Sequence, residues 1–193
     1  ARERGGAEMP ALRLGNFLQL KHHMSVDLYV DTIVSQAKLV VVRMLGGVSY
    51  WPYGIEQIAA TCRQKGIAFA AIPGDDQPDA ELVTLSTLES AACHRLWQYC
   101  VHGGPANAGQ FLKYAAFLLD QKSDWLEPQP LLRAGLYKAG GDSVGLDDIR
   151  ATWAANQPTV ALVFYRALVQ GGNLKAVDAL IEGLKKAGLN PLP

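Results

Sequence analysis

The stretch LVVVRMLGGVSYWPYG, residues 39–54, decides the expected fold. It opens on four apolar residues, three of them valines, and a run that is apolar on both faces is typical of a strand buried in a parallel sheet. Gly46 and Gly47 follow, and a glycine pair lets the backbone turn tightly because no Cβ restricts it. The stretch therefore predicts a strand over 39–45, a turn, and a helix over 54–65.

The same order of elements recurs further along the chain. Residues 67–72 are apolar and end at a Pro-Gly pair, and residues 159–165, TVALVFY, are expected to be the clearest second buried strand. Amphipathic helices are expected before 67–72 and after the glycine pair Gly171-Gly172. Strands that alternate with helices indicate parallel strands joined by right-handed crossovers. The predicted fold class is α/β, with a mostly parallel sheet flanked by helices.

Local signals position the remaining elements of the first half. Residues 12–20 are apolar in patches and are expected to form a short strand, and Ser25 is expected to cap the helix that follows. Ser86 to Glu89 matches a capping box and predicts a helix to about residue 101. Pro105, after two glycines, suits the first turn of another helix, since the N–H that it lacks would be unpaired there. These two helices, over 86–120, are interpreted as a helical insertion.

A segment with two prolines, residues 121–131, is expected to be a linker. Residues 1–131 would then be an N-terminal α/β domain, and residues 132–193 would begin a second α/β domain. Within the second, we expect a short strand over 132–137 and a short helix over 146–156. Both ends of the chain look cut, so the sequence is expected to be part of a longer protein.

Composition argues against several classes of partner. The chain carries 18 Lys and Arg against 18 Asp and Glu, and it shows no basic stripe. Nucleic-acid binding needs clustered Lys and Arg, so no nucleic-acid partner is expected. No apolar run is long enough to cross a bilayer and no signal peptide is visible, so no membrane association is expected. The three cysteines make no disulfide framework, which favours a cytoplasmic setting.

Nucleotide-binding motifs are absent from the sequence. It contains no G-x-x-x-x-G-K-S/T and no G-x-G-x-x-G. If ATP drives a reaction in which this chain takes part, other subunits must hold it.

The loop after residues 39–45 is the leading candidate for a ligand site, because ligands of open α/β sheets sit outside the carboxyl ends of the strands. Gly46 and Gly47 allow close approach of a ligand to the backbone. Tyr50 and Tyr53, with Trp51 between them in the chain, offer flat apolar surface with hydroxyls at its edge. The alternative interpretation is that these aromatic side chains pack in the core.

Charged residues flank the same strand ends. Arg43 and Arg166 each stand beside an apolar strand, with Tyr165 next to Arg166, and a guanidinium binds carboxylates bidentately. Asp75 and Asp76 lie just past the strand predicted over 67–72. The alternatives are a buried ion pair for the arginines and ordinary turn chemistry for the aspartates.

No metal site is predicted from the cysteines and histidines. Cys93, His94, Cys100 and His102 fall within ten residues, but their spacing is not that of a structural zinc site. They are interpreted as buried cysteines and surface histidines of an amphipathic helix.

Several stretches together carry a family resemblance. They are LGNFLQLKHHMSVDLYV, VVVRMLGGVSYWPYG and IPGDD, then GGP-x-NA within HGGPANAGQFLKYAAFLL, and last PTVALVFYRALVQGGNLKAVDALIEGLKKAGLNPLP. In this order and spacing, from about Leu12 to Pro193, they resemble the large-subunit family of cobaltochelatase and magnesium chelatase. The segment from Leu14 to Gly54 looks closer to the cobalt branch, so the chain is expected to be an N-terminal part of a cobaltochelatase large subunit.

The resemblance implies a function. Cobaltochelatase inserts Co²⁺ into a corrin, hydrogenobyrinic acid a,c-diamide, on the aerobic route to cobalamin, and its large subunit holds the tetrapyrrole. Co²⁺ would then be a substrate, and ATP with Mg²⁺ would be bound by AAA-type partner subunits rather than by this chain. Two alternatives stay open: a magnesium chelatase large subunit acting on protoporphyrin IX, and a non-catalytic α/β module that binds a small polar ligand.

The resemblance also implies roles for particular residues. Metal insertion removes two protons from the ring nitrogens, so a base near the ring is needed, and neutral imidazole can accept a proton. His22 matches the histidine of the family's L-K-H-x-M-S-V-D segment, whereas His23 stands where proline is expected and carries less weight. Arg43 and Arg166 would bind carboxylates on the corrin rim. For His22, the alternative is a solvent-facing loop.

Overall fold

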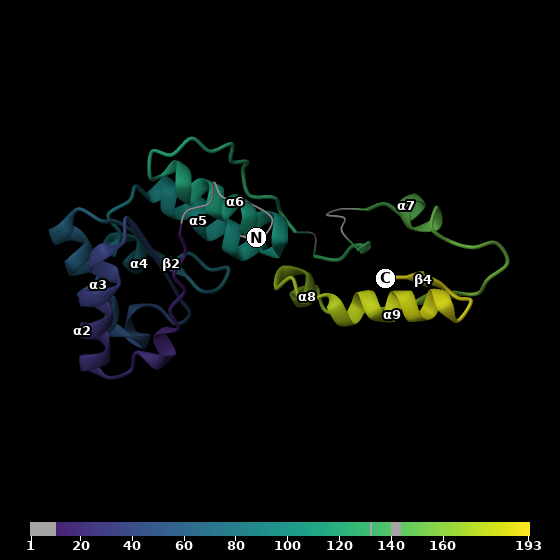
Figure 1. Cartoon of the computed structure of the whole chain (residues 1–193), viewed down its shortest axis with the longest axis horizontal. Coiled ribbons are helices and arrows are strands. Elements are labelled where there is room, and N and C mark those ends of the chain that lie inside the picture. The colour runs from purple at the N-terminus through teal and green to yellow at the C-terminus, as the bar shows by residue number, and fades with distance from the viewer. Residues whose placement is uncertain (1–10, 132, 140–143) are drawn as a thin grey trace. The chain divides into compact units, whose positions relative to one another are not determined.

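A computed structural model describes residues 11–131, 133–139 and 144–193 of the chain. These residues form two compact units, whose elements are coloured along the chain in Figure 1. Unit 1 contains the described residues up to Val101 together with Gly109–Pro128, and unit 2 contains His102–Ala108 and the described residues from Gln129 onward. The separate folding of domains 1–131 and 132–193 stays a prediction.

Helices make up most of unit 1. In chain order they are η2 (Phe17–Gln19), α2 (His23–Thr32), η3 (Val34–Gln36), η4 (Val48–Tyr50), α3 (Pro52–Lys65), α4 (Ala80–Leu85), α5 (Ser90–His102) and α6 (Gly104–Phe117), the last of which begins in unit 2. Gly66 ends α3 in the left-handed conformation, with φ of 66°, as its position after the last apolar residue predicts. Within the described residues, no helix is both long enough and apolar enough to span a membrane.

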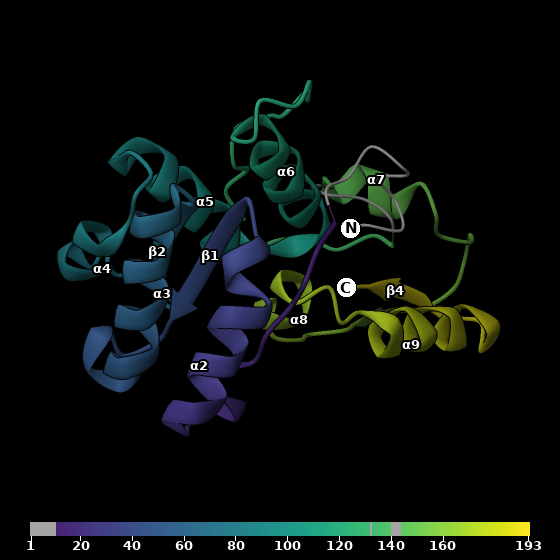
Figure 2. The same cartoon turned by 60° about the vertical axis from the view of Figure 1, so that its left-hand side comes forward.

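The sheet of unit 1 consists of β1 (Leu39–Met44) and β2 (Ala68–Pro73), which pair in parallel from Leu39–Ala68 to Met44–Pro73. Helix α3 connects the two strands, and Figure 2 shows β1 and β2 side by side. The predicted order of strand, glycine turn, helix and parallel strand is therefore confirmed, and so is the α/β class.

Two apolar clusters cover opposite faces of β2. Phe69 and Ala71 pack with α2 and α3, whereas Ala70 and Ile72 pack with α5 and with Tyr114 of α6. All four of these side chains are at most 1% exposed. Alternate residues of a strand point to opposite faces, so β2 is the buried strand that the pattern predicts. Most of β1 is only half-buried, because within the described residues it pairs on one side only.

The free edge of β2 is paired by hydroxyl groups rather than by a strand. The N–H of Ala71 donates to Ser86 Oγ at 2.9 Å, and the N–H of Phe69 donates to Thr87 Oγ1 at 2.7 Å. The predicted capping box at Ser86 is therefore wrong, and α5 begins four residues later, at Ser90. The hydroxyls satisfy buried strand N–H groups, which stabilises the protein more than capping an exposed helix end would.

Two other local predictions in unit 1 are also wrong. Residues 12–20 do not form a strand: they contain the single turn η2, which Asn16 caps by accepting a hydrogen bond from the N–H of Leu18 at 3.0 Å. Helix α2 starts before Ser25, at His23, and His22 occupies the N-cap position. The spacing of apolar residues in this stretch does not by itself distinguish an apolar turn from a short strand.

Unit 2 repeats the parallel arrangement on a smaller scale. Strand β3 (Thr159–Ala161) pairs in parallel with β4 (Asn190–Leu192), and the connection between them contains α8 (Arg166–Gln170) and α9 (Lys175–Lys186). Helix α9 buries Val177 and Ile181, which lie four residues apart on one face.

Three predictions for unit 2 need correction. The strand predicted over 159–165 ends at Ala161 and is not buried, since Val163 is 92% exposed and Tyr165 is 86% exposed. The helix predicted over 146–156 is the shorter α7 (Leu146–Arg150). Of the strand predicted over 132–137, Leu132 lies outside the described residues, and Leu136 forms only an isolated antiparallel bridge with Val144.

Candidate functional site

The turn after β1 carries the candidate site. Gly46 and Gly47 have φ values of 90° and 70°, which glycine adopts without strain. A Cβ at Gly47 would also come to 3.0 Å from a carboxylate oxygen of Asp79. The two glycines therefore redirect the chain from the strand end into η4 and the first turn of α3, which carry Tyr50, Trp51 and Tyr53.

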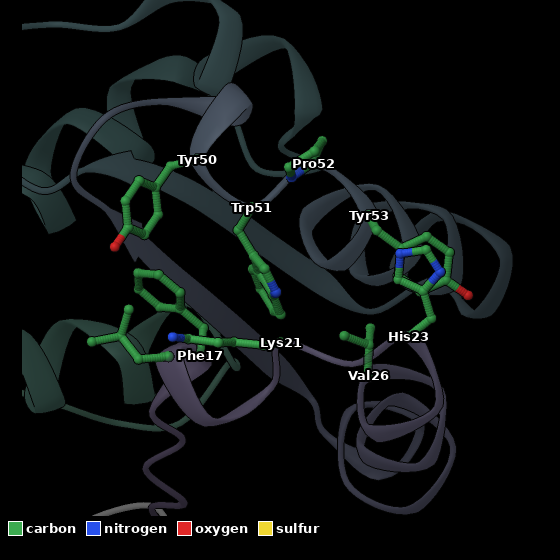
Figure 3. A pocket seen from close by; sticks show the side chains of 9 residues that line it. Phe17, Lys21, His23, Val26, Tyr50, Trp51, Pro52 and Tyr53 are labelled. Carbon is green, nitrogen blue, oxygen red and sulfur yellow. The ribbon is translucent and has the colours of Figure 1, made fainter.

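A pocket of about 360 Å³ opens in front of these aromatic residues. Figure 3 shows its lining, which comes from the chain between η2 and the start of α2, and from the end of η4 and the start of α3. The lining residues are Phe17, Leu18, Lys21, His23, Val26, Tyr50, Trp51, Pro52 and Tyr53. The pocket therefore joins two segments that are about thirty residues apart in the chain.

Trp51 forms the wall of this pocket. Its side chain is 9% exposed, its Nε1 donates to the carbonyl oxygen of Leu20 at 2.9 Å, and its ring lies 5.4 Å from that of Phe17. A Cβ at Gly54 would lie 2.0 Å from the indole ring, so the ring can occupy this place only above a glycine. Tyr50, by contrast, is 58% exposed and contacts Phe17 edge to face at 6.0 Å. Core packing thus describes Trp51 but not Tyr50.

Tyr53 and His23 form the opposite end of the pocket. Their rings stack with centroids 3.9 Å apart, and the Tyr53 hydroxyl donates to Asp27 Oδ1 at 2.7 Å. The hydrogen bond to Asp27 raises the pKa of Tyr53, because ionisation would place two negative charges side by side. Tyr53 is therefore a neutral, oriented ring at neutral pH.

Arg43, Asp75 and Asp76 lie at the strand ends of unit 1, but none of them lines the pocket. The exposed Arg43 side chain donates from Nη2 to the carbonyl oxygen of Gly74 at 2.7 Å, so the alternative of a buried ion pair is wrong for this arginine. Asp75 Oδ1 accepts from the N–H of Gln77 at 3.1 Å, which is ordinary turn chemistry. Asp76 Oδ1 accepts from Gln77 Nε2 at 3.3 Å.

The candidate residues of the second strand lie in unit 2. Tyr165 is at the N-cap of α8, and Arg166 begins that helix and donates from Nη1 to the carbonyl oxygen of Leu131 at 3.2 Å. Burial, together with the positive charge of Arg166, lowers the pKa of His102. Arg166 is also exposed and bound to a carbonyl, so a buried ion pair does not describe it.

Comparison with known proteins assigns the family. The model of the CobN/Magnesium Chelatase family matches residues 97–193, half of the chain. The chain belongs to this family.

Two curated relatives match almost the whole chain. The aerobic cobaltochelatase subunit CobN of Pseudomonas aeruginosa is 41% identical over 187 residues, and that of a Sinorhizobium species is 40% identical over 191 residues. These matches cover 96% and 95% of this chain but 15% of each relative. The solved catalytic subunit of cobaltochelatase from Mycobacterium tuberculosis is 27% identical with a TM-score of 0.68, over 86% of this chain and 13% of that one.

The GGP-x-NA segment of this CobN/Magnesium Chelatase family chain has a structural role. Asn107, 5% exposed, donates to the carbonyl oxygens of Gly103 and Gln129 at 2.8 and 2.9 Å, and it accepts from the N–H of Gln129 at 2.9 Å. Gly103 has φ of 64°, and a Cβ there would lie 2.8 Å from the carbonyl oxygen of Gln170. The segment therefore holds the start of α6 against the backbone of Gln129.

His22, His94 and the three cysteines do not line the pocket. His22 is exposed at the N-cap of α2 and does not line the pocket. Cys93 is buried, and His94 lies on the surface against the edge of Trp97 with ring centroids 5.4 Å apart. Burial raises the pKa of Cys62 to about 11, so this thiol is protonated and unreactive at neutral pH. Among the described residues, no three His, Cys, Asp or Glu side chains are grouped to hold a metal ion.

Lys21, Phe17 and His23 are pocket residues that the sequence reasoning missed. Phe17 falls in the strand predicted over 12–20, and Lys21 and His23 are the chain neighbours of His22, for which a solvent-facing loop was the alternative. Two signals could have found them: a basic residue and aromatic residues cluster just before one helix, and aromatic residues cluster just before the next.

Proposed function

We propose that this chain is part of the tetrapyrrole-binding large subunit of an ATP-dependent cobaltochelatase, which inserts Co²⁺ into hydrogenobyrinic acid a,c-diamide in aerobic cobalamin biosynthesis. The observation that carries the proposal is the match to two aerobic cobaltochelatase subunits, at 40–41% identity over at least 95% of this chain. An enzyme of this pathway would work in the cytoplasm.

The proposed contribution of the chain is binding of the corrin rather than insertion of the metal by itself. Co²⁺ is a substrate, and insertion must release two protons from the ring nitrogens. His22 is the proposed proton acceptor, since it is exposed beside the pocket-lining residues Lys21 and His23. The chain carries no nucleotide-binding motif, so ATP and Mg²⁺ are assigned to AAA-type partner subunits.

Each unit, taken by itself, carries residues that are proposed to contact the substrate. From unit 1 they are Arg43, Gly46, Gly47, Tyr50, Tyr53, Asp75 and Asp76, and from unit 2 they are Tyr165 and Arg166. Arg43 and Arg166 each donate one hydrogen bond to a backbone carbonyl oxygen. A guanidinium has further N–H groups, which could bind a carboxylate of the corrin rim. Tyr50 and Tyr53 offer ring faces to the macrocycle.

Insertion of magnesium into protoporphyrin IX is the second candidate, because the family model covers both branches. The two substrates differ at the rim: the corrin diamide carries several carboxylates, and protoporphyrin carries two. Rim contacts to cations therefore favour the corrin.

Absorbance titration of the full-length large subunit that carries this chain tests the proposal. Tight binding of the corrin diamide with weak binding of protoporphyrin IX is expected. The Arg43→Ala subunit should bind the corrin about tenfold more weakly, since a charge-assisted contact contributes about 1.5 kcal/mol or more. Preference for protoporphyrin would favour the magnesium branch, and binding of neither would favour a non-catalytic module for another ligand.

A further inference from the structure

We propose that the pocket in front of Trp51 holds one edge of the corrin and that Lys21 pairs there with a carboxylate of the rim. The inference rests on the proposed function and adds to it a place on the chain and a residue. Neither the family match nor the sequence pattern assigns Lys21 a role.

The size and the lining of the pocket fit an edge of a flat ring. Its volume of about 360 Å³ is near the low end of the roughly 300–1,000 Å³ range of small-molecule sites, so it is too small for a whole macrocycle of four rings with its side chains. The rings of Phe17 and Trp51 lie 5.4 Å apart and are tilted by 31° to each other, and Tyr50 packs edge to face against Phe17. Such an arrangement favours a planar, largely apolar group.

The charge of the pocket fits a carboxylate. Lys21 is exposed, and Figure 3 shows its side chain extending across the pocket toward Phe17. Among the described residues, the ion pairs involve other side chains, so the ammonium group of Lys21 is available for a ligand. Asp27, the acidic residue nearest in the chain, already accepts the hydrogen bond from Tyr53.

Two helix starts add to the positive potential that Lys21 creates in the pocket. Helices α2 and α3 both begin at the pocket, with His22 and Trp51 as N-caps, and neither start has a side-chain cap or an acidic residue in its first turn. Free N–H groups and the helix dipole favour negative charge at such ends. These two helix starts support the assignment of a rim carboxylate to this pocket, which rests on the cavity and on Lys21.

The test compares Lys21→Met with Lys65→Met in the full-length large subunit, by absorbance titration with the corrin diamide. Lys65 is the matched control, because it lies at the other end of α3, about 20 Å from Pro52 at 1.5 Å per residue. Lys21→Met should weaken binding about two- to fivefold, and Lys65→Met should leave it unchanged. Lys21→Arg should restore most of the affinity.

Salt dependence separates a charge contact from a structural role. Raising ionic strength screens the attraction, so the affinity of wild type should fall more steeply with salt than that of Lys21→Met. Tyr50→Ala should also weaken binding, whereas Leu28→Ala, at a slightly more exposed apolar residue outside the pocket, should not. Thermal melting of each variant checks that it is folded.

The outcomes distinguish the inference from the proposed function. If wild type binds the corrin and Lys21→Met binds it as tightly with the same salt slope, the pocket assignment is overturned and the proposed function stands. If wild type binds no corrin, both fail. If Lys21→Arg fails to restore the affinity lost in a folded Lys21→Met subunit, the loss does not come from charge, and the assignment of Lys21 is wrong.

Discussion

Gly54→Ala should destabilise unit 1 although alanine is the better helix former. The added methyl group would lie 2.0 Å from the Trp51 ring, which is held by its hydrogen bond to Leu20. Overpacking costs about 1–3 kcal/mol, and loss of the indole hydrogen bond costs about 1 kcal/mol. Replacement of glycine within a helix returns at most about 1 kcal/mol. The expected net loss is therefore about 1–3 kcal/mol.

Urea denaturation followed by circular dichroism measures this loss, with Gly109→Ala as the matched control. Gly109 lies in α6 of unit 1, and nothing is within 4 Å of a Cβ placed there, so its replacement should stabilise the chain by about 0.5–1 kcal/mol. If Gly54→Ala is as stable as Gly109→Ala, then the indole does not fill the space above Gly54, and the pocket wall described for Trp51 is wrong.

Three further predictions concern unit 2, pH and activity. Asn107→Ala should lower the free energy of unfolding by about 2–3 kcal/mol, because three hydrogen bonds are lost. Asn173→Ala, at an exposed residue, should change it by less than about 0.5 kcal/mol. Equal melting temperatures of the two variants would contradict the role of the GGP-x-NA segment. Burial raises the pKa of Tyr99 from 10.0 to about 12, so the folded state holds this proton more tightly, and stability present below pH 10 should fall as pH rises toward 12. Tyr99→Phe should reduce that fall in pH-dependent melting, and an unchanged slope would refute the assignment. The 193-residue chain, mixed with Co²⁺, corrin diamide, ATP and the ATPase subunits, should give no metal-insertion signal by absorbance, because it has no nucleotide motif and too few candidate residues to surround a macrocycle; turnover would show that it is sufficient.

The central α/β element could be predicted because local and long-range signals agree there. The valines of β1, the glycine turn and the apolar residues at helical spacing in α3 all favour one arrangement, and β2 completes it. The pattern in 159–165 is equally apolar, yet Val163 and Tyr165 are exposed, because exposure depends on which elements cover a strand and not on the strand's own sequence.

The pocket could be predicted only in part. The position of the aromatic turn follows from the strand end, so Tyr50 and Tyr53 were found. Phe17, Lys21 and His23 cluster in sequence just before α2, but only the tertiary structure shows that this cluster faces the start of α3. Ser86 shows the same limit, since its hydroxyl had two possible partners and the buried N–H of Ala71 is the one that it binds.

Hydrogen–deuterium exchange of the full-length large subunit, with and without the corrin diamide, tests most directly whether this chain contacts the corrin. The first-turn amides of α2 and α3 have no side-chain cap and should exchange quickly in the free subunit. The account predicts that corrin binding slows exchange in peptides covering residues 17–27 and 46–56, and that Lys21→Met reduces this protection. Protection confined to other parts of a subunit that binds the corrin would contradict it.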